Sequence, residues 1–336
     1  MNDNLEYIFT IDSQAVIVRE DDLSISELSN GNFRVKLYVA NITQKITKTR
    51  MNNILNLTTT NSVKRLNKVK QADSYRKIFS FDEGKARFAN VFEIIINKTT
   101  GAVEDFKMYK SDIMVTKNYN YESVQNEHSE ERIRESILLL EKLYNVASSN
   151  RINAKEHLKI EHLIRSELGL VKNVKIPQII ELIINTISEK LGEYFFINGY
   201  PFLYYNQVNN SESIMNEFIK NFNSGENNVI TRDTLLCYRE LLSYINDFSI
   251  ENKGFYSIGS DYNCRYTSSI TRKADLITNI LLEEFVYNKA SLETKIYWVD
   301  QLRTFEKRKI RWNTRNLYNK KFRKREKIWK HLCTHL

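Results

Sequence analysis

Alternating apolar and polar residues in the first third of the chain predict β-strands. The run 33–42 is rich in Val, Leu and Tyr, and its alternation is typical of a strand with one buried face. A β-branched and aromatic run over 91–96, a turn over 97–101 and a second run over 103–115 predict a hairpin. We therefore expect a β-meander in this part of the chain.

Farther along, the hydrophobic pattern changes to a helical period. Apolar residues recur on one face over 130–144, and a helical pattern returns over 160–168. A helix over 177–192 would begin at a proline and end at a glycine, which is the usual asymmetry of helix ends. A further helix is predicted near 232–248, whereas 65–76 fits either a helix or a loop.

The composition favours a folded protein with a sizeable core. Of the 336 residues, 42% are hydrophobic and 12% are aromatic, which argues against disorder. This length allows one domain or two, but only 2 prolines and 9 glycines leave little material for a flexible linker, so one compact unit is favoured. Because no apolar run approaches a membrane span and no basic, apolar leader begins the chain, we expect a cytoplasmic protein without a membrane partner.

Several classes of site find no support in the sequence. The cysteines Cys237, Cys264 and Cys333 are far apart and form no Cys-x-x-Cys pair, which argues against a disulfide framework or a zinc site. The sequence also contains no Gly-rich phosphate loop, Gly-x-Ser-x-Gly elbow or Cys/His nucleophile pair. Two charged segments remain as candidates.

The first charged segment is basic and lies near the C-terminus. The net charge is +9, yet residues 303–330 alone hold 13 Lys or Arg against 2 acids, so the rest of the chain is slightly negative. Aromatic residues are interspersed among these bases. Such a helix could follow the phosphates of RNA, or it could lie on the domain through its aromatic stripe, and both can hold at once.

The second charged segment is acidic and lies near the N-terminus. Short apolar runs flank Asp12, Glu20, Asp21 and Asp22, so ordered backbone would hold their carboxylates together. Close carboxylates repel one another, and hard cations such as Mg²⁺ prefer oxygen ligands, so the cluster is typical of a divalent-metal site. An acidic surface loop before a strand is the alternative that these residues leave open.

The acidic segment resembles the active-site signature of the RNase II family, whose catalytic unit is the RNB domain. The family pattern is Thr-Ile-Asp, five residues, then Asp-x-Asp-Asp, followed by Ala-Leu-Ser and a Gly-Asn-Tyr-Arg-Val turn and strand. In an ungapped alignment, Asp12 matches the first aspartate and Asp21 the fourth, while Glu20 replaces the third. Val18 stands at the second position, so the sequence does not supply one ligand of the family.

Further segments resemble the family in the same order along the chain. The residues concerned are Ser80, Gly84, Arg87, Ala89, Tyr121 to Val124, Pro201 to Tyr205, Ser257 to Gly259 and Tyr266 to Leu276. The family's Pro-x-Leu-Tyr-Arg strand is present without its arginine, because Tyr205 stands in that place. Thr271 likewise stands where the family has the arginine that approaches the scissile phosphate, and Arg272 or Lys273 could substitute for it.

The resemblance implies a protein of the α/β class with a mixed α+β arrangement. A single RNB-like domain over 1–300 would have a mixed β-sheet wrapped by helices around an RNA channel. Residues 301–336 would form a basic C-terminal helical segment packed on the same domain. The family's cold-shock and S1 barrels are missing from the sequence, so a protein partner could supply RNA-binding domains. The oligomeric state stays open.

The activity that the resemblance implies is 3′-to-5′ hydrolysis of single-stranded RNA to 5′-mononucleotides with Mg²⁺ or Mn²⁺. The implied catalytic residues are Asp12, Glu20, Asp21 and Arg272, of which the three acids would hold the metal. The implied RNA-binding residues are Tyr121, Tyr204, Tyr266, Thr267, Ser268 and Arg315. A catalytically impaired relative that binds RNA or a partner protein is the alternative function, favoured by Val18 and Thr271.

Overall fold

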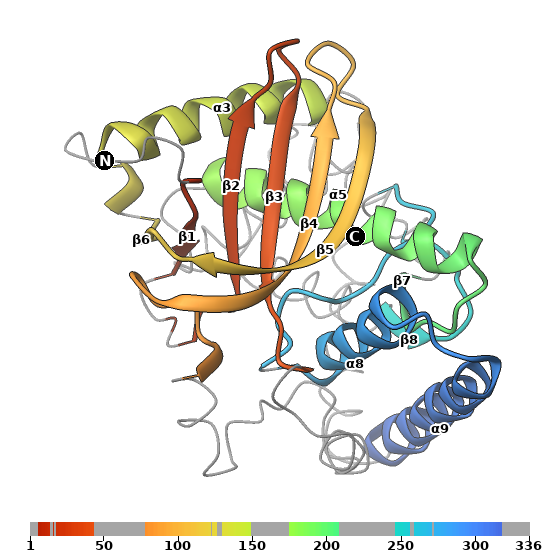
Figure 1. Ribbon diagram of the computed structural model, residues 1–336. Coiled ribbons are helices and arrows are strands. Elements are labelled where there is room, and N and C mark those ends of the chain that lie inside the picture. Colours follow the sequence, from red (N-terminus) through yellow and green to blue (C-terminus); the bar gives the residue numbers. More distant parts are fainter. Residues whose placement is uncertain are drawn as a thin grey trace, which may run out of the picture.

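The computed structural model describes most of the chain (Figure 1). The residues that it describes are 6–13, 16, 18–43, 78–121, 123–125, 130–148, 175–207, 246–255, 259–270 and 272–317. The predicted helix over 160–168 and the ambiguous stretch over 65–76 lie outside these residues, as do Cys237 and Cys333. Cys264 is described, and it is a free, buried thiol.

A mixed sheet forms the centre of the described structure. Its strands are β1 (Phe9–Asp12), β2 (Asp21–Glu27), β3 (Phe33–Ala40), β4 (Ala86–Ile96), β5 (Val103–Met114) and β6 (Lys117–Asn120). The spatial order is β5-β4-β3-β2-β1-β6. Only the contact of β1 with β6 is parallel, and all the other neighbours are antiparallel. The strands predicted from alternation over 33–42, 91–96 and 103–115 are confirmed, which establishes the predicted meander.

The turn between β4 and β5 requires a glycine. Gly101 has a φ of +67°, and a Cβ at this position would lie 2.7 Å from the backbone of Ala147. Ala147 is the last residue of α3 (Glu131–Ala147), the helix predicted over 130–144. A side chain on residue 101 would therefore force the hairpin away from the end of α3.

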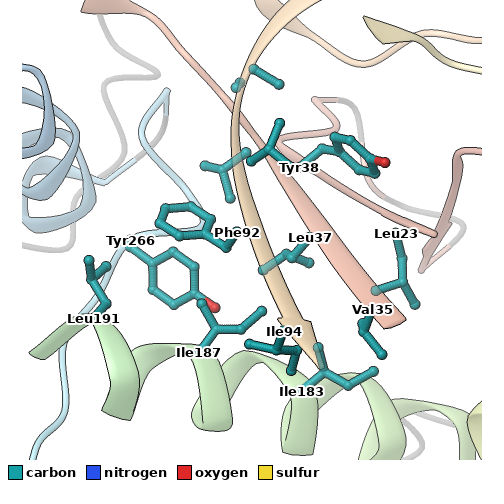
Figure 2. Packing of buried hydrophobic residues seen from close by; sticks show 14 of the residues in the cluster. Leu23, Val35, Leu37, Tyr38, Phe92, Ile94, Ile183, Ile187, Leu191 and Tyr266 are labelled. Carbon is teal, nitrogen blue, oxygen red and sulfur yellow. The ribbon is translucent and has the colours of Figure 1, made fainter. Parts of the chain in front are cut away.

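The helix α5 (Lys175–Ile197) crosses one face of the sheet, behind β2 to β5 in Figure 1. Figure 2 shows Ile183 and Ile187 of this helix turned toward Val35 and Ile94 of the sheet. All four side chains are buried. Full burial of one aliphatic side chain stabilises the fold by about 1.5–3 kcal/mol. This layer between the helix and the sheet is therefore the main core of the domain.

The predicted end of this helix at Gly192 is wrong, because the helix continues to Ile197. A Cβ on Gly192 would lie only 3.0 Å from the Cβ of Tyr262. The glycine thus allows a neighbouring segment to approach the helix and does not cap it. Pro177 falls within the first turn of the helix, which begins at Lys175.

A second, smaller group of elements lies beside the sheet, at the lower right of Figure 1. Strand β7 (Tyr204–Gln207) pairs antiparallel with β8 (Asn246–Ser249). The predicted helix over 232–248 is wrong at its end, because residues 246–248 are strand. The ladder with β7 and the contact between the Tyr205 and Phe248 rings, whose centroids lie 4.7 Å apart, override the weak helical pattern there.

The last described elements are α8 (Lys273–Leu281), a π-helical segment (Leu282–Tyr287) and α9 (Leu292–Leu317). In α9, Trp298 and Leu302 are buried, and Glu306 accepts a hydrogen bond from Ser249 of β8 at 2.6 Å. This helix passes through residue 300, and the division of the chain at that residue stays a prediction. Among the described residues, no helix is both long and apolar enough to cross a membrane.

Candidate functional site

The candidate site lies where β1 ends and β2 begins. The two strands are antiparallel, with Phe9 opposite Leu23, so the last residue of β1 lies beside the first residues of β2. Asp12 ends β1, and Asp21 and Asp22 begin β2. Asp12, Asp21 and Asp22 are therefore placed by two neighbouring strands of the sheet, and Glu20 immediately precedes β2.

Consecutive residues of a strand point to opposite faces of the sheet. Asp21 thus shares a face with Leu23, and Asp22 shares the other face with Ser24, whose hydroxyl lies 3.1 Å from that of Tyr38. Asp21 is partly exposed, whereas Asp22 is only 1% exposed. Solvent therefore reaches Asp21 more readily than Asp22.

The carboxylates of this site disfavour one another's ionisation. Burial raises the pKa of Asp12 to about 6, although the Arg19 guanidinium opposes the shift. Burial, followed by the charges of Asp12 and Glu20, raises the pKa of Asp21 well above its usual range. Burial and the charges of Asp21 and Asp12 do the same to the pKa of Asp22. The acids are thus close enough for their charges to repel, and a cation between them would relieve that repulsion.

Glu20 has a partner in the main chain. Its carboxylate is buried and accepts a hydrogen bond of 2.6 Å from the backbone N–H of Ile270. Nearby, the Ser269 hydroxyl donates to the carbonyl of Ala40 at 2.8 Å. These two bonds hold the segment before α8 against the ends of β2 and β3, so Glu20 contributes to the position of that segment whether or not it also holds a metal.

Asp275 and Arg272 complete the far side of the site. Asp275, in the first turn of α8, is fully buried and accepts a hydrogen bond of 2.9 Å from the backbone N–H of Ser268. Arg272 is exposed, and its charge opposes the rise in the pKa of both Asp21 and Asp275. The predicted guanidinium is therefore close enough to interact with two acids of the cluster. Thr271 lies outside the described residues.

A divalent cation fits this set of donors only in part. Among the described residues, no group of three His, Cys, Asp or Glu side chains is arranged to hold a metal ion. Val18 supplies no ligand, because its hydrocarbon side chain has no donor atom, and it packs against the hydrophobic core. However, the Oδ2 atom of Asp12 is buried without a hydrogen-bond partner. Since Mg²⁺ is commonly bound by one or two carboxylates with water and substrate phosphates, Asp12 and Asp21 fit that mode.

The three tyrosines predicted to bind RNA lie in different environments. Tyr266 is 2% exposed, lies edge-on to the Phe92 ring and donates a hydrogen bond of 3.0 Å to the carbonyl of Ile184 (Figure 2). Tyr204 is 4% exposed. A base needs an open ring face on which to stack, and these two rings do not offer one. Tyr121 is partly exposed, and its N–H donates to the carbonyl of Asp12 at 3.2 Å, so it remains next to the site.

The other predicted RNA-binding residues are divided in the same way. Thr267 is buried, whereas Ser268 is partly exposed and holds Asp275 through its N–H. Arg315 belongs to α9, but its side chain lies outside the described part of the structure. The roles of these residues in RNA binding stay predictions.

Asp22 belongs to the predicted acidic cluster but is not among the implied metal ligands, and Asp275 and Arg265 have no predicted role. Asp22 was aligned with a small residue of the family, and only strand geometry shows that it is buried. Asp275 could have been found, because an acid in the first turn of a helix interacts favourably with its N-terminus. Arg265 has no local sequence signal, since its neighbours come from a distant strand.

With this geometry described, comparisons with known proteins are informative. A model of the RNB domain family matches residues 3–288. RNase R of Mycoplasma genitalium in complex with double-stranded RNA has a TM-score of 0.69 at 13% identity, over 93% of this chain and 63% of that one. The same protein with ribose-methylated single-stranded RNA gives 0.68 at 13% identity, over 93% and 55%. Yeast Ssd1, a pseudonuclease, gives 0.65 at 14% identity, over 92% and 43%.

These structural matches confirm the predicted fold class, a mixed sheet with helices. The chain spans between 43% and 63% of the length of the three solved structures. No curated protein matches it by sequence. Since the neighbours include an RNA-bound ribonuclease and a pseudonuclease, structural likeness alone does not decide between activity and its loss.

Proposed function

Because the chain belongs to the RNB domain family, we propose that it hydrolyses single-stranded RNA from the 3′ end to 5′-mononucleotides with Mg²⁺ or Mn²⁺. The observation that carries this proposal is the pair Asp12 and Asp21 at the adjacent ends of β1 and β2, where burial and then the charge of Asp12 raise the pKa of Asp21. Two partly exposed carboxylates that repel each other are suited to a cation that an RNA phosphate also contacts.

In this proposal, the residues of the chain have distinct roles. Asp12 and Asp21 hold the divalent ion, which when bound polarises the phosphate and lowers the pKa of a water molecule. Arg272 lies on the α8 side of Asp21 and stabilises the charge that develops on the phosphate, because its planar guanidinium can bind two oxygens. Glu20 positions the segment that leads to Arg272.

The proposed substrate rests on the family and on its RNA-bound neighbour. RNase R was solved with single-stranded and with double-stranded RNA, so RNA binding is a property of a protein with this fold. We propose that a channel admits the 3′ end of a single strand, so that recognition does not depend on base sequence. Tyr121, next to Asp12, is the described ring best placed to contact the terminal nucleotides.

A second function, RNA binding without hydrolysis, is favoured by a specific observation. Val18 replaces a carboxylate of the family pattern and packs against the core, so the site has fewer oxygen ligands. Yeast Ssd1 is a pseudonuclease with the same fold. This alternative predicts salt-sensitive RNA binding with no shortening of the RNA in any metal.

The two functions are separated by incubating the purified protein with 5′-end-labelled single-stranded RNA in Mg²⁺, in Mn²⁺ and in EDTA. We expect progressive shortening from the 3′ end in the metals only. Asp21→Asn should lower the rate by about 100-fold or more, because it removes a metal ligand and its charge. Asp112→Asn, an exposed acid of β5, is the matched control and should keep the wild-type rate. Wild-type protein that binds the RNA but leaves it intact would establish the second function.

A further inference from the structure

The side chain of Arg265 lies over the ring of Tyr205. The family strand that Pro201 to Tyr205 resembles ends in an arginine, whereas this chain has Tyr205 there. In the structure, the guanidinium of Arg265 lies over the Tyr205 ring, 4.8 Å from its centroid. A guanidinium is therefore present beside position 205, although it comes from a residue 60 positions later in the sequence.

Backbone pairing brings the two residues together. Tyr204 forms an antiparallel bridge with Cys264, and the Tyr205 N–H donates to the carbonyl of Asn263 at 2.9 Å. Residue 265 is then the diagonal neighbour of residue 205, and a long side chain reaches across such a diagonal. The contact thus follows from the register of two segments, which fixes it in the fold.

The ring beneath the guanidinium is held on its other sides. Tyr205 packs against Phe248 of β8 and Phe255, with centroid distances of 4.7 and 5.3 Å. Arg265 itself remains exposed. A cation stacked on a fixed aromatic ring loses less conformational freedom when it binds an anion, so this arginine is prepared for a ligand.

The position of Arg265 links it to the candidate site. Its charge interacts with those of Asp275 and of Glu181, and Asp275 also interacts with Arg272 and Asp21. Arg265 begins the segment 265–270 that Glu20 fixes through Ile270. Two exposed guanidinium groups, those of Arg265 and Arg272, therefore both interact with Asp275, and the charge of Arg272 also acts on Asp21.

We propose that Arg265, supported by the Tyr205 ring, binds a backbone phosphate of the single-stranded RNA as it approaches Asp12 and Asp21. The inference rests on the proposed function for its ligand, but it concerns binding and not hydrolysis. A planar guanidinium matches the geometry of a phosphate. Arg265 is exposed, and although it also interacts with the Tyr205 side chain through a hydrogen bond, its five N–H donors exceed what that bond uses. In this arrangement Arg272 acts at the linkage being cleaved and Arg265 at a neighbouring phosphate.

The test is the salt dependence of RNA binding by the full chain in EDTA, measured by fluorescence anisotropy with a labelled single-stranded oligonucleotide. For a single strand, removal of one bound phosphate reduces the slope of log K against log salt by about 0.7. Arg265→Gln should show this reduction with weaker binding at low salt, whereas Arg265→Lys should keep the slope because its charge remains. Arg132→Gln is the matched control, since Arg132 is also exposed and lies over a tyrosine ring, that of Tyr7, but on α3.

Each outcome bears on this proposal separately from the nuclease function. A reduced slope in Arg265→Gln with an unchanged slope in Arg132→Gln supports it, even if the wild-type protein fails to degrade RNA. An unchanged slope in Arg265→Gln overturns it, even if the wild-type protein degrades RNA efficiently, and would mean that Arg265 only neutralises Asp275 and Glu181. Weaker binding with an unchanged slope, as expected of a base stacked on the guanidinium, also overturns it. The thermal unfolding midpoint of each variant checks that it is folded.

Discussion

Two groups of buried acids in this protein have opposite relations to their surroundings. Glu20 and Asp275 each accept a hydrogen bond from a backbone N–H, that of Ile270 and that of Ser268. In contrast, both carboxylate oxygens of Asp22 and the Oδ2 atom of Asp12 are buried without a hydrogen-bond partner. Asp275 is intermediate, because its Oδ1 atom is bonded to Ser268 while its Oδ2 atom is buried without a partner. The backbone hydrogen bonds offset part of the cost of burying Glu20 and Asp275, whereas a buried carboxylate oxygen without a partner is costly to the fold unless a cation or a proton accompanies it.

This difference separates acids that the sequence presents as one cluster. Glu20, Asp21 and Asp22 are consecutive, yet one is bonded to a distant segment, one is partly exposed and one is enclosed on the opposite face. The alternation of side chains along β2 places Asp21 and Asp22 on opposite faces of the sheet. Adjacent carboxylates can therefore differ in environment: that of Glu20 is hydrogen-bonded, that of Asp21 is partly exposed and proposed to bind metal, and that of Asp22 is buried without a hydrogen-bond partner.

The largest change in stability is expected at Glu20. Glu20→Ala leaves the N–H of Ile270 buried without an acceptor and should lower the free energy of unfolding by about 1–3 kcal/mol. Glu20→Gln keeps an acceptor oxygen, so its destabilisation should be smaller. Chemical denaturation in EDTA measures both. If Glu20→Gln has wild-type stability but no nuclease activity, Glu20 acts mainly as a metal ligand and the comparison with Asp275 fails.

A smaller change in the free energy of unfolding, of opposite sign, is expected when Asp22 is replaced. The pKa of Asp22 is higher in the folded than in the unfolded state. The protonated carboxyl therefore favours the folded state at low pH, and this contribution to stability is lost as the pH rises through the folded pKa. Asp22→Asn does not titrate and should be more stable than the wild type at pH 8, by on the order of 1 kcal/mol, with little difference at pH 4.

Denaturation curves at several pH values in EDTA test this expectation. Asp112→Asn serves as the exposed control, whose curves should run parallel to those of the wild type. Parallel curves for Asp22→Asn as well would show that Asp22 is compensated in solution, and the contrast between the two groups of acids would disappear.

The smallest effect is expected at Tyr266, which separates packing from RNA binding. Tyr266→Phe removes the hydrogen bond to Ile184 but keeps the ring against Phe92, so the stability should fall by about 1 kcal/mol. RNA affinity should not change.

Tyr121→Ala, beside Asp12, should instead weaken RNA binding by about 1–3 kcal/mol if its ring stacks on a base. Anisotropy titrations of the two variants would contradict the account if their order were reversed.

The sheet could be predicted from the sequence because its signal is local. Alternation over 33–42 and the hairpin over 91–115 predicted strands that the structure confirms as β3, β4 and β5. Predictions failed where contacts between distant segments decided the outcome. Gly192 was taken as a helix end, although it allows Tyr262 to approach α5, and residues 246–248 pair with β7 instead of forming a helix.

The site was predictable to the same extent. The resemblance to the family pattern singles out Asp12 and Asp21, two acids that the structure does bring together because β1 and β2 are neighbouring strands. The bond from Glu20 to Ile270 spans 250 positions, and the stacking of Arg265 on Tyr205 depends on the register between residues 204 and 264. No local pattern of residues encodes such contacts, so these roles could be found only in the structure.

The most direct test of the central claim is the binding of Mn²⁺, followed by its electron paramagnetic resonance signal, in the presence of hydrolysis-resistant single-stranded RNA. The measurement is made at about pH 7.5, because burial raises the pKa of Asp12 to about 6 and a protonated carboxyl is a poor ligand. We predict that Asp12→Asn and Asp21→Asn each weaken Mn²⁺ binding by about 10-fold or more, whereas Asp112→Asn leaves it unchanged. Equal Mn²⁺ affinity in all four proteins would contradict the account.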